Sequence, residues 1–237
     1  MAVYDQNQKG PEPAELVQYR QLPGATYQDM HGARTGKYKA DGSPEDVYAV
    51  VLDNLIREQG CICAYCMCRI PEKGKNATIE HIQPQSVSPS QALDYRNMLA
   101  VCDGNRGSHS NAHKTCDAHR GDSPLSVNPL LADTIVDVKY RSDGTIYSDK
   151  AAVQNDLDVT LNLNCKERRL PENRKFALDQ LLQEIRKKHP TGSIKQYCQD
   201  KLAEYQTESP PFTLCRHPDL LVGKTCPMRY RSCPISL

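Results

Sequence analysis

The 237-residue sequence predicts an α+β fold in which short strands and helices surround a cysteine-rich segment. Three observations predict it. Apolar residues recur at helical spacing after Pro44, two strand-like runs occur at 77–82 and 97–101, and six of the eleven cysteines lie between Cys61 and Cys116. The length suits one large domain, or a small catalytic domain with additions.

Composition excludes several classes of protein. The 30 Lys and Arg residues nearly balance the 29 Asp and Glu residues, which argues against a protein that coats nucleic acid through excess positive charge. No run of eighteen apolar residues is present, so no membrane span is expected. The first residues lack the basic and then apolar order of a secretory signal, so we expect a cytoplasmic protein. In that reducing compartment, clustered thiols more often bind metal than form disulfides.

The chain divides into four expected parts. Residues 1–42, rich in Gly, Pro and Gln, are expected to form an irregular N-terminal arm. Residues 43–135 are expected to form the core, which begins with a helix capped by Ser43 and ended by Gly60. Residues 136–208 are expected to form a β-hairpin and a helical region, and 209–237 an irregular tail that contains cysteines.

Secondary structure after the core helix is predicted from local patterns. The two strand-like runs are separated by a Pro/Ser loop at 84–91. Asp143-Gly144 lies between two apolar stretches and predicts a hairpin of 138–140 with 145–147. Apolar positions from Leu178 to Ile185 predict one helix, and those from Ile194 to Tyr205 predict another.

The cysteines predict a zinc site. Cys63-Ala-Tyr-Cys66 has the two-residue spacing that places two thiolates on one side of an ion, and tetrahedral zinc needs two further ligands. Cys102 and Cys116 are the nearest downstream candidates. Flanking cysteines at 61 and 68 are alternative ligands, and the plainer interpretation is that the pair is merely buried and apolar.

A second chemical feature lies inside this cysteine frame. In Ile79-Glu80-His81-Ile82, a histidine at the end of a short strand follows a carboxylate. Such a histidine can act as a general base while its neighbour binds a hard divalent ion. Taken alone, this pair is a weak signal that favours an ordinary core or surface histidine.

The ordered set of residues resembles the HNH endonucleases, whose core is a ββα-metal unit. The matching positions are Cys63, Cys66, Glu80, His81, Asn97, Cys102, Cys116 and Asp117. The runs Ile-Glu-His-Ile-Gln-Pro-Gln-Ser and Leu-Asp-Tyr-Arg-Asn-Met-Leu-Ala-Val-Cys resemble one branch more narrowly. That branch is the nuclease subunit of the Septu anti-phage defence system, also found with some retrons. The resemblance covers roughly residues 10–190.

The resemblance implies a mechanism. His81 takes a proton from the water that attacks the scissile phosphorus, and Asn97 orients His81 across the two strands. Glu80 and Asp117 hold a catalytic Mg²⁺ or Mn²⁺ ion. The four-cysteine zinc is structural and holds this small unit together.

Two departures from the family pattern leave alternatives open. Position 117 is Asp, where many members have Asn or His. The segment between Cys102 and Cys116 supplies His109 and His113, and His119 follows it, so a histidine is an alternative metal ligand. His119 is the best alternate to Asp117.

Contacts with partners are the least specific predictions. Arg96, Lys114 and Arg120 lie near the site in the sequence and are expected to contact nucleic-acid phosphates, with DNA as the favoured target and RNA as the alternative. The Septu resemblance implies an ABC-type ATPase partner. In the tail, Cys215, His217, Cys226 and Cys233 are a loosely spaced candidate for a second zinc site.

A competing interpretation comes from another class of protein. The same cysteine frame fits a non-catalytic zinc module that binds nucleic acid or protein. A module of that kind does not need a base, an amide and two carboxylates inside the frame.

Overall fold

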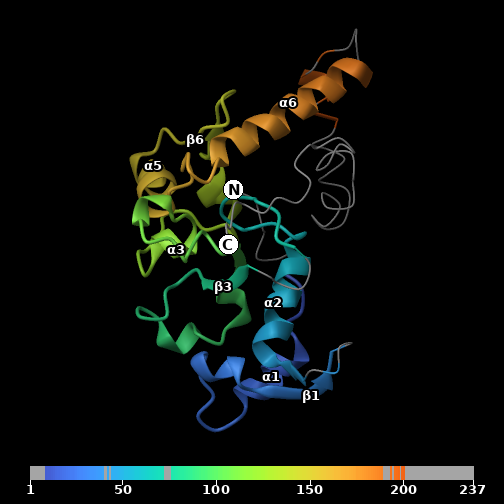
Figure 1. Cartoon of the computed structure of the whole chain (residues 1–237), viewed down its shortest axis with the longest axis vertical. Coiled ribbons are helices and arrows are strands. Elements are labelled where there is room, and N and C mark those ends of the chain that lie inside the picture. The colour runs from blue at the N-terminus through green and yellow to red at the C-terminus, as the bar shows by residue number, and fades with distance from the viewer. Residues whose placement is uncertain are drawn as a thin grey trace.

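The computed structural model describes residues 9–39, 42, 44–71, 76–188, 193, 195–197 and 199–200. Its elements are α1 (Ala14–Arg20), η2 (Gln28–His31), β1 (Arg34–Tyr38), β2 (Pro44–Asp46), α2 (Val47–Glu58), β3 (Ala77–His81), η3 (Pro89–Gln91), η4 (Tyr95–Asn97), β4 (Met98–Cys102), η5 (Asn111–His113), α3 (Asp117–Arg120), α4 (Ala132–Ile135), β5 (Lys139–Tyr140), β6 (Ile146–Tyr147), α5 (Ala151–Asn155), the π-helical turn η6 (Asp156–Thr160) and α6 (Leu170–Lys188) (Figure 1). The strands pair as three two-stranded antiparallel sheets, so the fold mixes helices with small sheets.

The N-terminal segment is not irregular, and the prediction for 1–42 is wrong in its described part. α1 buries Leu16 and Tyr19 against the core, and the Tyr19 hydroxyl donates to the carbonyl of Thr26 at 2.7 Å. Lys9 donates to the carbonyls of Tyr95 and Met98, and burial lowers the pKa of its ammonium to about 8. The seven residues of α1 make about two turns, which give too little periodicity to read from sequence, and the stability of so short a helix comes from tertiary packing.

The helix α2 begins later than predicted. Residues Pro44–Asp46 form β2, which pairs with β1, so the helix starts at Val47 and not at the expected cap. The cap is Asp46, whose Oδ1 accepts from the amide of Ala49 at 2.6 Å. Ser43 lies outside the described residues. Val51 and Leu55 are fully or almost fully buried, as helical spacing predicts.

The predicted strands at 77–82 and 97–101 are confirmed as β3 and β4, with a one-residue difference at their ends. They pair antiparallel, with Ala77 opposite Cys102 and His81 opposite Met98. Gln59, just after α2, fixes this hairpin to the helix. Its side-chain amide donates to the Ala100 carbonyl and accepts from the Ala100 amide, both at 2.7 Å. This buried amide pair holds the strands that carry the candidate site.

The second hairpin is confirmed. β5 pairs antiparallel with β6 around Asp143-Gly144, and Asp143 accepts from the amide of Thr145 at 2.8 Å. Gly144 has φ of +85°, and a Cβ atom there would lie 2.0 Å from the carbonyl oxygen of Pro171. Glycine is required because the start of α6 passes so close to this turn.

The predicted helix around Leu178–Ile185 is confirmed as part of α6, which extends along one end of the molecule (Figure 1). In the next predicted helix, from Ile194 to Tyr205, residues 195–197 and 199–200 are helical. The other positions of that helix are not among the described residues. The tail at 209–237, with its candidate second zinc site, also lies outside. Among the described helices, none is both long and apolar enough to cross a bilayer. The division into four parts stays a prediction.

Candidate metal centre and active site

Four buried cysteines form one cluster, and they are the four that the sequence predicts. The ligand atoms of Cys63, Cys66, Cys102 and Cys116 all lie within 4.8 Å of one another. The Sγ–Sγ distances are 3.9 Å for Cys63–Cys116, 3.7 Å for Cys66–Cys102 and 3.8 Å for Cys102–Cys116. Four thiolates at about 2.3 Å from a tetrahedral zinc are separated by about 3.8 Å. The cluster can therefore hold a structural metal such as zinc.

The backbone around the cluster is arranged by short-range contacts. The amide of Met67 donates to the carbonyl of Cys63 at 3.0 Å, which closes the first cysteine turn. Gly104, in the second turn, has φ of +62°, and a Cβ atom there would lie 2.2 Å from the carbonyl oxygen of Thr115. The turn after β4 can therefore lie directly against the residue that precedes Cys116.

The alternative ligands do not join the cluster. Cys61 and Cys68 are half-buried and lie outside the group of four. The four thiols affect one another strongly. Burial alone would raise the pKa of Cys63, but contacts with the other three sulfurs together lower it well below its ordinary value. A thiolate among close sulfurs is the state that binds zinc.

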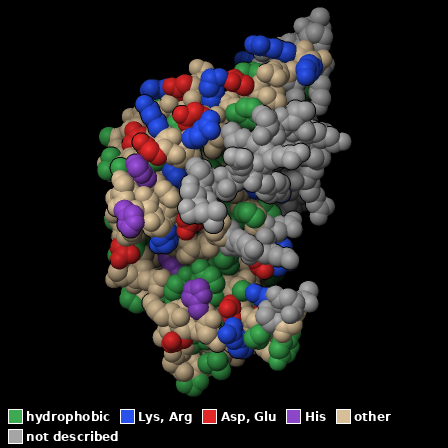
Figure 2. Space-filling model, viewed as in Figure 1, with side chains coloured by type: hydrophobic (Ala, Val, Ile, Leu, Met, Phe, Trp, Pro, Cys, Tyr) green, Lys and Arg blue, Asp and Glu red, His purple; other side chains and the backbone are tan. Residues whose placement is uncertain are grey.

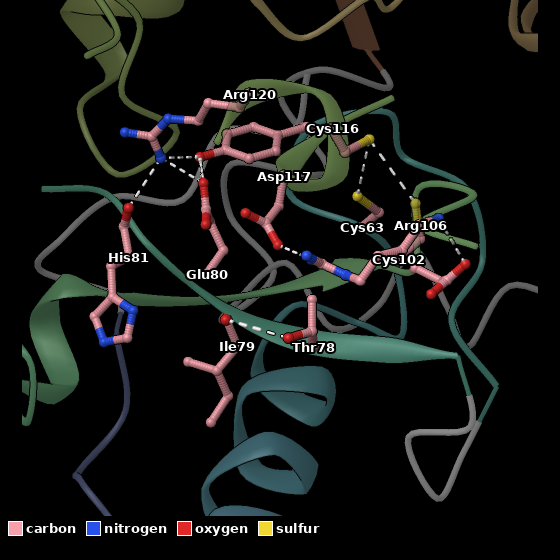
Figure 3. A network of polar contacts seen from close by, with 12 residues as sticks. Cys63, Thr78, Ile79, Glu80, His81, Cys102, Arg106, Cys116, Asp117 and Arg120 are labelled. Carbon is pink, nitrogen blue, oxygen red and sulfur yellow. Dashed lines mark hydrogen bonds and ion pairs between the residues drawn. The ribbon is translucent and has the colours of Figure 1, made fainter. Parts of the chain in front are cut away.

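Glu80 forms a buried ion pair with Arg120. The guanidinium of Arg120 donates to the Glu80 carboxylate (Figure 3). It also donates to the His81 carbonyl at 2.9 Å and to the Ile82 carbonyl at 2.8 Å. The Tyr65 hydroxyl donates to the same Glu80 carboxylate at 2.9 Å. The Arg120 side chain is 1% exposed. The prediction that Arg120 contacts nucleic acid is therefore wrong. Its guanidinium is buried and binds Glu80 and backbone carbonyls at the end of β3.

Two carboxylates meet beside this ion pair. Asp117, the first residue of α3, lies next to Glu80 on the same side of β3 and also pairs with Arg106 (Figure 3). Burial, and then the nearby charge of Asp117, raise the pKa of Glu80 to about 8, and Arg120 opposes this rise without cancelling it. The two carboxylates thus repel each other, and either a bound proton or a bound cation would reduce this repulsion.

His81 has a defined tautomer. Its Nε2 lies 2.9 Å from the carbonyl oxygen of Ala92, which can only accept, so Nε2 carries the proton. Nδ1 is left with a lone pair and accepts from the Gln85 side chain at 3.2 Å. The Tyr27 ring packs edge-on at 4.6 Å, and burial lowers the pKa of the imidazole. A neutral imidazole with Nδ1 unprotonated is the form that a general base requires.

The imidazole and the carboxylates lie on different sides of the strand. Successive side chains of a strand alternate, and the His81 ring points away from the side of β3 that carries Glu80 and Asp117 (Figure 3). His81 is the last residue of β3, however, and the charge of Asp117 still acts on its pKa. A substrate that contacts both groups must therefore pass around the end of this strand.

Asn97 does not contact His81 directly, so its predicted role needs correction. Its Oδ1 accepts from the amide of Gln83 at 2.8 Å, and its Nδ2 donates to the carbonyls of Gln83 and Gln91 at 3.1 and 3.3 Å. These bonds fix the ends of the loop that follows β3. That loop leads to Ala92, which binds His81, so Asn97 acts on the imidazole through the loop.

The other predicted residues lie around this centre. Arg96 is exposed and Lys114 is half-buried. The alternate ligand His119 is directed to η6, where its Nδ1 donates to the Thr160 carbonyl at 3.1 Å, and it joins no group of three or more metal-ligating side chains among the described residues. His109 and His113 are exposed. Sequence reasoning missed Arg106, whose side chain is 52% exposed and whose only signal was its place between Cys102 and Cys116, the last two cysteines of the cluster.

Comparison with known proteins gives one partial similarity. No family model matches the chain. A stretch of 73 residues is 35% identical to the Septu protein PtuB of Bacillus thuringiensis. The chain is partly similar to a Septu protein. The stretch is 31% of this chain and 24% of the relative, so the match spans about a quarter of that protein's length.

Proposed function

We propose that the chain is a metal-dependent endonuclease of the HNH class, which hydrolyses phosphodiester bonds in the cytoplasm. It acts as the effector of an anti-phage defence complex. The observation that carries this proposal is the meeting of Glu80 and Asp117 on one side of β3, together with His81 on the other side at the end of the strand, with its Nδ1 free of a proton. Glu80 and His81 lie on β3, and Asp117 lies on α3. The cysteine cluster holds these two elements together, because one of its cysteines is on β4, the partner strand of β3, and another directly precedes α3.

The donor set fits a hard divalent ion. Carboxylate oxygens are the ligands that Mg²⁺ and Mn²⁺ prefer, and Arg120 and Tyr65 both bind Oε1 of Glu80, so Oε2 remains for Asp117, with which Glu80 also interacts, or for an ion. Burial, and then the charge of Asp117, raise the pKa of Glu80 in spite of Arg120, so a further cation at this point would stabilise the carboxylate form. A bound Mg²⁺ or Mn²⁺ ion would supply positive charge to the phosphate and to the leaving 3′ oxygen.

His81 supplies the base in this proposal. Nδ1 takes a proton from water, and the bond from Nε2 to the Ala92 carbonyl keeps the ring in the reactive tautomer while it becomes charged. Gln85 now occupies the position at Nδ1 that the water needs, so its side chain must rotate away. Asn97 holds the loop that presents both Gln85 and Ala92.

Arg106 is a better candidate for phosphate binding than Arg120. It is exposed and attached to Asp117, so an ion on that carboxylate would release the guanidinium toward the substrate. Arg96 and Lys114 are further candidates. Basic and acidic side chains are intermingled over the face seen in Figure 2, with no continuous basic surface among the described residues there. The partner therefore contributes part of the nucleic-acid affinity.

The defence role rests on the similarity to a Septu protein and on the Septu-like motifs of the sequence. An ABC-type ATPase is the partner that this resemblance implies. Co-expression with an ATPase encoded beside this chain, followed by size-exclusion chromatography, tests the assignment. A stable complex supports it, and separate elution of both proteins under matched nucleotide conditions contradicts it.

Cleavage of plasmid, single-stranded DNA and tRNA in Mg²⁺ or Mn²⁺ tests the activity. We expect cleavage by the wild-type protein, and a loss of about two orders of magnitude or more in Glu80→Ala. Gln18→Ala, an exposed change on α1, is the matched control. Full activity of Glu80→Ala at ordinary Mg²⁺ concentration would remove this residue from the metal site.

A specific observation favours the non-catalytic module as a second candidate. Glu80 and Asp117 are each paired with an arginine, and Asn97 is fully bonded to the backbone. Those contacts are also what a purely structural network would contain. A zinc-loaded protein that binds nucleic acid but cleaves none of these substrates would support the module.

A further inference from the structure

A cavity of about 650 Å³ lies between the N-terminal segment and the loop that follows β3. Its walls come from the end of α1 and residues 25–28 on one side, and from Gln85 and residues 89–90 and 92–94 on the other. The described part of the chain thus offers a concave site of a size that holds a small organic group. None of the cysteine ligands or carboxylates described above lines it.

The cavity adjoins His81. Three of its wall residues contact the imidazole: the Tyr27 ring at 4.6 Å, the Ala92 carbonyl at 2.9 Å and the Gln85 amide at 3.2 Å. A group bound in the cavity would therefore lie one side chain away from Nδ1. This places the cavity on the side of β3 opposite Glu80, with the Gln85 side chain between the cavity and Nδ1.

The cavity wall is polar but poor in positive charge. Among the described residues that line it, the one cation is Arg20, which already pairs with Glu12 and donates to the Leu93 carbonyl, and Asp94 adds a negative charge. Two side-chain amides face each other across it, with Gln28 Nε2 donating to Gln85 Oε1 at 3.3 Å. Such a wall does not suit a string of phosphates, which requires Lys and Arg.

Amide side chains next to an aromatic ring suit a nucleobase. Amides donate and accept hydrogen bonds in the plane of a base edge, and bases that are free of pairing are recognised in this way. Gln28 and Ser90 are exposed, so their side chains can rotate toward a ligand without the loss of core contacts. A base in a duplex cannot reach such a cavity without leaving its partner.

We propose that this cavity binds a nucleobase of the substrate strand next to the phosphate presented to His81, and that the substrate is single-stranded at that point. This inference rests on the proposed nuclease function and specifies its substrate class. A base that inserts between Gln28 and Gln85 breaks their hydrogen bond and frees the Gln85 amide from Nδ1. Base binding and exposure of the general base are thereby coupled.

The test measures affinity in Ca²⁺ with the zinc-loaded full chain, so no cleavage is needed. Fluorescence anisotropy compares a 12-nucleotide single strand, as DNA and as RNA, with a duplex of the same sequence. Gln28→Ala removes one amide, and Ser90→Tyr adds a ring to the wall. Gln18→Ala changes an exposed glutamine on α1 outside the cavity and is the matched control.

We expect the single strand to bind at least tenfold more tightly than the duplex. Gln28→Ala should weaken it roughly fivefold, as expected for the loss of one hydrogen bond, and should raise KM with little change in kcat. Tighter binding of the DNA or of the RNA strand then names the natural substrate. Equal affinity for duplex and single strand, or wild-type affinity in both cavity variants, would overturn the inference. Absence of cleavage together with binding that depends on Gln28 would instead overturn the nuclease and leave the base site standing.

Discussion

The cysteine cluster and the acidic site both use the β3–β4 hairpin and the start of α3, and the turn before β3 adds Cys63 and Cys66 to the cluster, but their side chains are in different states. The four sulfurs contact one another at the spacing of a tetrahedral ion, so this set is complete apart from a metal. Glu80 and Asp117 are instead each bound by an arginine, and His81 by a loop. The ligand atoms of the first site therefore meet one another, whereas the charged groups of the second are held by other protein groups.

The largest effect is expected when the cysteine cluster is broken. Cys63→Ser should abolish stoichiometric zinc and cooperative unfolding, because a small unit with such a site depends on its metal to fold. Metal analysis and thermal unfolding measure both. Cys61→Ser, a half-buried neighbour outside the cluster, should leave both unchanged. A stable, zinc-loaded Cys63→Ser protein would show that the ligands are wrongly assigned.

The next effect concerns the buried cation. Arg120→Leu leaves Glu80, the Tyr65 hydroxyl and two carbonyls without their partner, which should lower the free energy of unfolding by about 3–5 kcal/mol. Chemical denaturation measures it, and the exposed Arg96→Leu serves as the control. If Arg120→Leu is as stable as Arg96→Leu, the interior network contributes little.

A smaller effect is expected from pH. The pKa of Glu80 is about 8 in the folded protein and near 4.5 when unfolded, so between these values the folded state binds the extra proton. The free energy of unfolding should therefore fall as pH rises from 5 to 8, by at most about 1.4 kcal/mol per unit. Urea unfolding without added divalent ions measures this slope. Glu80→Gln should flatten it, and an unchanged slope in that variant would assign it to other groups.

The smallest effect on the free energy of unfolding is expected from a change at Arg106. The same change should have a clear effect on metal binding. Because its side chain is exposed, Arg106→Gln should change the free energy of unfolding by less than about 1 kcal/mol. Loss of competition for Asp117 should tighten Mn²⁺ binding, which calorimetry measures. Weaker or unchanged Mn²⁺ affinity would separate Asp117 from the ion.

Features that depend on neighbouring residues could be predicted from the sequence, whereas features that depend on distant partners could not. Cys63 and Cys66 are defined by local spacing, and the Asp143-Gly144 turn by local backbone preference, so both were predicted correctly. The interior role of Arg120 depends on Glu80, forty residues earlier, and an arginine reads as a surface cation until that partner is placed. Asn97 was assigned to His81 by analogy, whereas its partners are backbone groups of a loop whose path the sequence does not define.

The central claim is that the imidazole of His81 acts as a base in phosphodiester cleavage. Its direct test is the rate of cleavage in Mg²⁺ or Mn²⁺ by wild-type protein and His81→Ala at equal zinc content and with their melting temperatures measured. We expect His81→Ala to lose about 10²–10⁴-fold in rate with its melting temperature nearly unchanged. A His81→Ala protein that cleaves as fast as wild type would contradict it.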